Sequence, residues 1–121
     1  MKFACFGYIN ETDWEKLPKQ DQSKILEEYL NYYGQLKIKN IFLGGTGLKS
    51  VTEAIKLSIK NGNIQETTWQ LNKEQIGGFF IIESENLGEA KSIVSKHRGL
   101  KIGAFEIRVV DEEITEIVGA K

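Results

Sequence analysis

The chain has 121 residues, 40% of them hydrophobic and 27% charged, which is the composition of a single ordinary globular domain. Its formal net charge of -1 excludes the bulk positive charge that attracts DNA, RNA or an anionic membrane. A single cysteine excludes an internal disulfide, and a single histidine leaves too few soft ligands for a structural zinc site, so we expect neither a metal nor a cofactor.

The amino-terminal segment predicts a cytoplasmic protein. The apolar stretch after Lys2 covers only seven residues before the acidic Glu11 and Asp13, which is shorter than the centre of a secretory signal. No apolar run approaches the roughly 20 residues that span a bilayer. We therefore expect no membrane partner and a cysteine that stays reduced.

The first third of the chain predicts a strand and a long helix. Residues 2–9 alternate loosely and are rich in aromatic residues, which favours a strand with both faces at least partly covered. After Pro18, apolar residues recur at helical spacing over about 15 to 20 residues. They form one wide stripe that needs a sheet beneath it: Ile25, Leu26, Tyr29, Leu30, Tyr32, Tyr33 and Leu36.

A short strand at residues 41–43 is followed by the glycine-rich segment 44–50. This segment is not a Walker loop, because Leu48 separates Gly47 from Lys49, and it leads toward a strand rather than a helix. The pattern favours a conformational role for the glycines over a phosphate-binding role.

The middle of the chain predicts a hairpin. Apolar and polar residues alternate over residues 55–60, and residues 61–62 are Asn-Gly, the strongest short-range signal for a two-residue hairpin turn. The return strand is expected over residues 63–68. The apolar run at residues 79–82 then predicts a central strand.

The last third predicts a second helix and a final strand. Asn86 and Glu89 have the spacing of a helix N-cap pair, and Gly99 is a plausible stop. Residues 105–109 alternate as a strand. The order of elements, β-α-β-β-β-α-β, predicts a ferredoxin-like α+β sandwich with an added hairpin strand.

Residues 111–121 form a short extension beyond the domain expected over residues 1–110. Ile114, Ile117 and Val118 stand at helical spacing, which favours a short amphipathic helix or partner-docking segment. An extra edge strand is the alternative, because Thr115 and Val118 are β-branched.

His97 is the candidate catalytic residue. Its ordinary pKa lies near neutrality, and it falls on the apolar stripe of the second helix, near the carboxyl end, where the helix dipole favours the charged form. A hydrogen-bonded imidazole at the edge of the core is the structural alternative to a proton shuttle.

Arg108 and Glu106 are the candidate ligand-binding pair. They share one face of the last strand, about 7 Å apart, and that strand is expected to be central in the sheet. A bidentate clamp for a small carboxylate and a simple structural ion pair both fit this pattern. Trp69 fits a stacking platform or a loop anchor. Cys5, in the middle of a strand, fits a small hydrophobic residue better than a nucleophile.

Three segments resemble the YCII-related family of the DGPF type. Residues 43–48 resemble its GG-x-x-L turn, and residues 73–81 are similar to its KEQ-x-GG-aromatic block. Residues 103–108 match its closing G-x-x-E-x-R. Residues 66–69 depart from the family's Asp-Gly-Pro-Phe, and the early His/Asp pair proposed as catalytic in related proteins has no counterpart.

The resemblance implies a ferredoxin-like dimer of the dimeric α/β-barrel type, with a cleft between sheet and helices. Our first hypothesis is a homodimer that binds a small, anionic molecule in a cleft lined by Tyr8, Trp69, His97 and Arg108. The second is an isomerase or lyase in which His97 shuttles a proton and Arg108 holds a substrate carboxylate.

Overall fold

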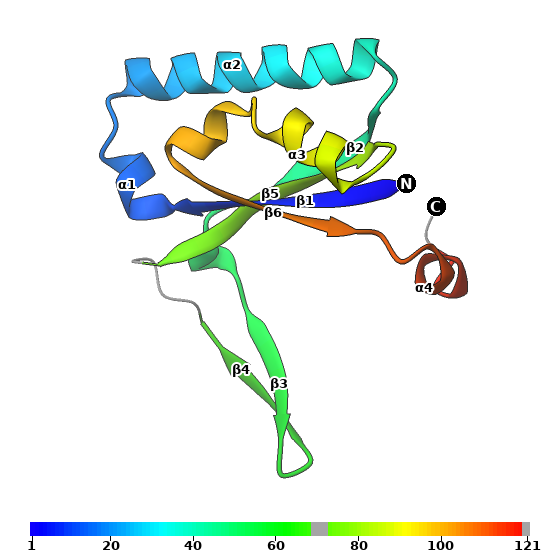
Figure 1. The fold of residues 1–121 in the computed structure, drawn as a ribbon. Helices are drawn as coiled ribbons and strands as arrows, with labels where there is room; N and C mark the ends of the chain where they lie inside the picture. The colour runs from blue at the N-terminus through cyan, green and yellow to red at the C-terminus, as the bar shows by residue number, and fades with distance from the viewer. Residues whose placement is uncertain (69–72, 120–121) are drawn as a thin grey trace.

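The computed structural model describes residues 1–68 and 73–119. Two helices, α2 and α3, lie on one side of a four-stranded sheet, and a separate two-stranded hairpin projects away from the other side (Figure 1). The elements are β1 Lys2–Asn10, α1 Glu11–Glu15, α2 Lys19–Ile38, β2 Phe42–Gly47, η1 Val51–Glu53, β3 Lys56–Lys60, β4 Asn63–Thr67, β5 Glu74–Glu83, α3 Leu87–Val94, η2 Arg98–Lys101, β6 Gly103–Val109 and α4 Glu112–Ile117.

The main sheet has the order β2-β5-β1-β6, with every neighbouring pair antiparallel. With β3 and β4 set aside as an inserted hairpin, this is the predicted ferredoxin-like arrangement, and β5 is central as expected. The expectation that the strand of Arg108 is central is wrong: β6 pairs with β1 alone among the described strands and forms an edge.

Local signals account for most of the element boundaries. The Asn86 side chain accepts the N–H of Glu89 at 2.8 Å and begins α3, as the N-cap spacing predicted. Asn61 and Gly62 have φ angles of 53° and 80°, the left-handed pair that a tight hairpin turn of this type requires. The carboxyl-terminal prediction is confirmed in its helical form, because Asp111 accepts the N–H of Ile114 and caps α4.

The glycine-rich segment is more regular than predicted. Strand β2 continues from Phe42 through Gly47, where the sequence suggested a loop. It does so through a bulge at Gly44, whose φ of 134° is a conformation that L side chains rarely adopt. Within the described residues, no helix is long and apolar enough to cross a membrane.

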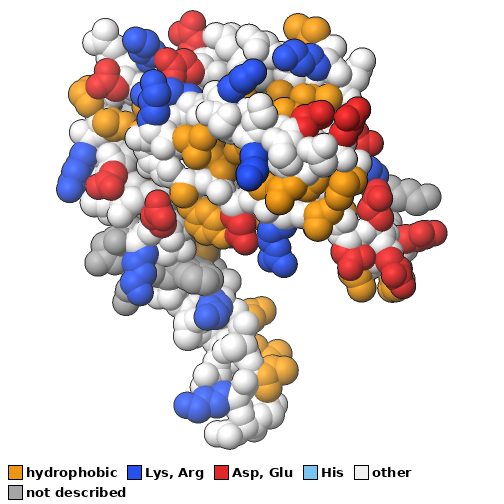
Figure 2. Space-filling model, in the orientation of Figure 1, with side chains coloured by type: hydrophobic (Ala, Val, Ile, Leu, Met, Phe, Trp, Pro, Cys, Tyr) orange, Lys and Arg blue, Asp and Glu red, His pale blue; other side chains and the backbone are white. Residues whose placement is uncertain are grey.

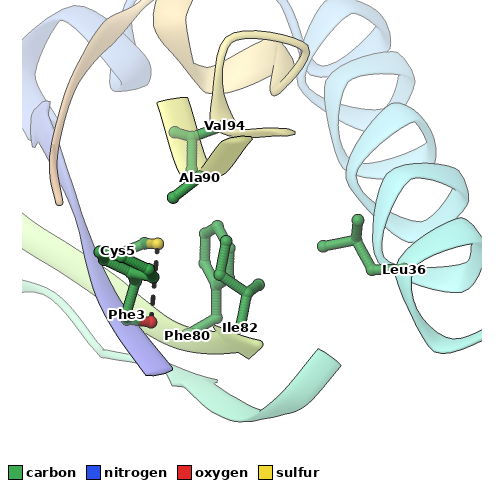
Figure 3. Packing of buried hydrophobic residues seen from close by; sticks show 7 residues of the cluster. All are labelled: Phe3, Cys5, Leu36, Phe80, Ile82, Ala90 and Val94. Atoms are coloured by element: carbon green, nitrogen blue, oxygen red, sulfur yellow. Dashed lines mark hydrogen bonds between the residues drawn. The ribbon is translucent and has the colours of Figure 1, made fainter. Parts of the chain in front are cut away.

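The core lies between the sheet and the two helices, at one end of the sheet. Strands β1 and β5 direct Phe3, Cys5, Phe80 and Ile82 toward Leu36 of α2 and toward α3 (Figure 3). From α3, the core is completed by two buried small side chains, Ala90 and Val94. Cys5 is fully buried, and burial raises the pKa of its thiol to about 12, which fits the interpretation of an inert core residue.

Candidate ligand cavity

A row of glycines crosses the helix-facing side of the sheet beside the core. The strand register pairs Gly47 with Gly78 and Gly78 with Gly7, while the same row continues on β6 as Phe105. Directly opposed residues of antiparallel strands point to the same face, so Gly47, Gly78 and Gly7 leave the sheet without side chains here. We call these three residues the glycine row.

A cavity of about 450 Å³ lies over the glycine row, under the carboxyl-terminal half of α2. Its walls are mainly aromatic and its polar groups are few, which is the usual character of a small-molecule site. Residues that line it include Tyr29, Leu30, Tyr33, Gly34 and Lys37 of α2, Phe42 of β2, Phe80 of β5, Phe105 of β6, Gly99 of η2 and its N-cap His97. The predicted cleft between sheet and helices therefore exists.

Gly34 helps to form the cavity from the helix side. It stands inside α2, four residues before the end of the helix, where glycine costs about 1 kcal/mol relative to alanine. A Cβ added at Gly34 would meet no atom within 4 Å. Position 34 therefore faces open space, and a larger side chain there would occupy the cavity.

His97 lies in this cavity wall, but in a different element from the one predicted. Helix α3 ends at Val94, and His97 is the N-cap of η2, where its Nδ1 accepts the N–H of Gly99 at 2.8 Å. Its Nε2 lies 2.7 Å from the hydroxyl oxygen of Tyr33. His97 is thus a buried imidazole with both ring nitrogens engaged, which corresponds to the structural alternative.

The charged form of His97 is disfavoured, contrary to the expectation from the helix dipole. The imidazole is 4% exposed, and rings of Tyr29, Tyr32 and Phe105 have their centroids within 4.8 Å of it. Burial lowers the pKa of His97 from 6.5 to about 4. The loss of hydration in this aromatic surrounding outweighs any dipole effect, and His97 is neutral at pH 7.

The lowered pKa predicts that acid destabilises the fold through His97. Above pH 6.5 the residue is neutral in both states; as the pH falls toward 4, the unfolded chain binds a proton that the folded chain does not. We expect the free energy of unfolding to fall by about 2 kcal/mol between about pH 7 and 5.

Urea unfolding at several pH values measures this loss. The matched control is His97→Asn, which retains an acceptor for the N–H of Gly99 but cannot titrate, and whose stability should stay nearly flat in the same window. A wild-type profile that is equally flat would contradict the prediction.

The expectation that Arg108 and Glu106 enter the cleft is wrong. In the register of β1 and β6, Cys5 pairs with Ile107 and faces the helices, so the flanking residues Glu106 and Arg108 face the opposite side. Both are exposed there. Glu106 accepts a hydrogen bond from the Tyr8 hydroxyl at 2.8 Å, and this bond is the main cause of the raised pKa of Tyr8.

Two further residues, Tyr8 and Trp69, were predicted for the ligand site. Tyr8 contributes to the cavity lining, although its hydroxyl group is bonded to Glu106 on the other face. Trp69 lies outside the described residues. Among the described residues, no group of three or more histidine, cysteine or acidic side chains could hold a metal ion.

Tyr33, Gly34 and Lys37 line the cavity but were not predicted as site residues from the sequence. Tyr33 and Lys37 are four residues apart, so they lie on one face of α2, and the Lys37 ammonium lies 5.5 Å from the centre of the Phe42 ring. The available signal was a glycine inside an otherwise strong helix, because such a residue usually marks close packing or open space.

Fold and cavity together define a ferredoxin-like α+β protein with an inserted hairpin and a ligand-sized space between sheet and helix. The family model of the YCII-related domain matches residues 1–114, and the chain belongs to this family. A search of curated proteins found no match.

The fold is also similar to that of a solved structure. It is 5-chloro-2-hydroxyhydroquinone dehydrochlorinase from Burkholderia phenoliruptrix AC1100, in complex with 2,5-dihydroxybenzoquinone. The TM-score is 0.53 with 18% sequence identity, and the match covers 92% of this chain and 94% of that chain. At this identity the similarity concerns the fold alone.

Proposed function

We propose that this chain binds a small, flat, oxygen-bearing molecule in the cavity between α2 and the glycine row. The main support for this proposal is the cavity itself. Its volume of about 450 Å³ falls within the range of roughly 300–1,000 Å³ that is typical of ligand sites. At Gly47 an added Cβ would meet no atom within 4 Å, so a planar ring can approach the backbone there, whereas the Phe105 ring covers Gly7.

The polar groups of the cavity favour a ligand with oxygen atoms and negative charge. Lys37 supplies a cation, and the Tyr33 hydroxyl supplies a hydrogen-bonding group, whereas the remaining wall is largely apolar. This arrangement preserves the earlier hypothesis of an anionic ligand but replaces Arg108 with Lys37 as the source of positive charge.

An enzymatic role is the second candidate, because the neighbouring fold is that of a dehydrochlorinase. In an isomerase or lyase that uses His97 as proton shuttle, one ring nitrogen would have to face the substrate. Both nitrogens of His97 are engaged with Tyr33 and Gly99, so the present geometry supports binding better than this mechanism.

The proposed binding can be tested with 2,5-dihydroxybenzoquinone, the molecule that accompanies the neighbouring structure. In a titration followed by ¹H–¹⁵N correlation spectra, we expect shifts of the amide resonances of Gly7, Gly78 and Gly99, which line the cavity. The hairpin-turn amides of Asn61 and Gly62 serve as an internal control. No shift at about 1 mM ligand, or shifts confined to the hairpin, would contradict the proposal.

A homodimer formed through the open face of the sheet is the second part of the proposed function. We define the open face as the side not covered by α2 or α3; its residues are Ala4, Phe6, Tyr8, Phe79, Ile81, Glu106 and Arg108. The Phe6 and Phe79 rings lie 6.1 Å apart at its centre, and Glu106 and Arg108 lie on its edge strand. An apolar centre with both signs of charge at its margin can match a second copy of itself around a two-fold axis.

The hairpin and α4 extend this self-complementary pattern. One side of the hairpin carries Ile55, Leu57, Ile59 and Ile64, which are 63–75% exposed, and the other side carries lysines (Figure 2). Helix α4 is acidic and also exposes Ile114 and Ile117. A hairpin of two strands is marginally stable alone, so a second copy that covers its apolar side would stabilise it.

A further inference from the structure

The hydrogen bonds of His97 determine where its proton lies. Nδ1 accepts the N–H of Gly99 at 2.8 Å, so this nitrogen carries no proton. A neutral imidazole has one N–H, which must therefore be on Nε2. At 2.7 Å from the Tyr33 oxygen, Nε2–H is the donor and the Tyr33 hydroxyl oxygen is the acceptor.

Tyr33 consequently keeps its own O–H for another partner. The bond to His97 uses the oxygen as acceptor, and the Tyr33 hydroxyl donates to no other group among the described residues. The side chain lines the cavity, which is the space where a further acceptor can be placed. Burial raises the pKa of Tyr33, so the hydroxyl stays protonated and remains a donor at neutral pH.

We propose that the Tyr33 hydroxyl donates a hydrogen bond to an oxygen atom of the bound molecule, and that His97 is the positioning residue that holds this hydroxyl in place. The inference rests on the proposed function and names its ligand class: a flat ring with a carbonyl or phenolate oxygen. Lys37, one helical turn further along α2, places a positive charge at the same cavity and favours an oxygen with negative charge.

The test compares two flat rings of similar size. We would measure dissociation constants of 2,5-dihydroxybenzoquinone, which has oxygen acceptors, and of p-xylene, which has none. Tyr33→Phe removes only the hydroxyl group, so it should weaken binding of the quinone about tenfold and leave binding of p-xylene unchanged.

The role of His97 is separated from a merely structural one by a double-mutant cycle. His97→Asn retains the cap on Gly99 but cannot reach Tyr33, and we expect it to weaken quinone binding several-fold in the wild-type background. In the Tyr33→Phe background the same change should have no further effect, because the hydroxyl that His97 orients is already missing. Full additivity of the two substitutions would overturn the positioning role.

The chain's single histidine also allows a direct check that needs no ligand. The ¹⁵N shifts of the imidazole should show a proton on Nε2 and none on Nδ1. A proton on Nδ1, or equal affinity of wild type and Tyr33→Phe for the quinone, would overturn this inference and leave the cavity as a binding site. Failure of the quinone to bind the wild type, whether or not p-xylene binds, would instead overturn the proposed function itself.

Discussion

Replacing Gly34 with leucine is expected to abolish binding of 2,5-dihydroxybenzoquinone while making the protein more stable. In a helix, the side chain leans toward the preceding turn, which at this position is formed by Leu30 at the cavity wall. Because a Cβ at position 34 meets nothing within 4 Å, the leucine side chain can enter the cavity without displacing backbone. Removing a glycine from inside α2 should also stabilise the helix by about 0.5–1 kcal/mol.

The opposite directions of the two effects make the result informative. Loss of binding together with a higher melting temperature cannot be attributed to misfolding. Gly34→Ala is the matched control, because it gives the same gain in helix propensity but leaves most of the cavity empty, so it should keep most of the affinity. Calorimetric titration and thermal unfolding of the three proteins provide both readouts. Wild-type affinity in Gly34→Leu would show that the ligand binds elsewhere.

Replacing Phe79 with lysine is expected to convert the proposed homodimer into a folded monomer. Phe79 is 36% exposed and packs against Phe6 in the middle of the open face. Around a two-fold axis each substitution is present twice, so two uncompensated charges would be buried in the apolar centre of the interface. We expect the dissociation constant of the dimer to rise at least about a hundredfold.

Sedimentation analysis at micromolar concentration measures the change, and circular dichroism confirms that the variant is folded. Ile38→Lys is the matched control: it introduces the same charge at a residue that is 82% exposed at the end of α2, on the other side of the sheet. This control should remain dimeric. A monomeric wild type would refute the dimer, and a dimeric Phe79→Lys would place the interface on another surface.

Local sequence signals accounted for the fold because they are strong and short-ranged. The Asn61-Gly62 turn and the Asn86 cap each act within a few residues, and both are present as predicted. The helix expected after Pro18 is α2, but the full burial of its apolar stripe was wrong, because Leu26 and Leu30 are 54% and 72% exposed. The family resemblance over three separate segments is confirmed by the match over residues 1–114. Helix α1, five residues long and capped by Asn10, was missed because it has no room for a periodic pattern.

The candidate site was predicted less well. It depends on the order of the strands and on which residues of each strand face the helices. Alternation showed that Glu106 and Arg108 share a face of their strand, but not which face the helices cover. The pairing of Cys5 with Ile107 decides that question and sends Arg108 to the open face. In the same way, the sequence showed a histidine near the end of a helical pattern but not the aromatic rings around it.

By itself, the sequence determined the class of fold, the positions of the main elements and the hairpin turn, because these follow from periodicity, caps and turn residues that act locally. It also contained the glycines that make the cavity possible. Only the tertiary structure decided that Gly7, Gly47 and Gly78 form one row across three strands, and that Tyr33 and His97 meet beside it, 64 positions apart in the chain. Such contacts depend on which strands pair and in which register, and this is settled by burial across the whole domain rather than by any local stretch of residues.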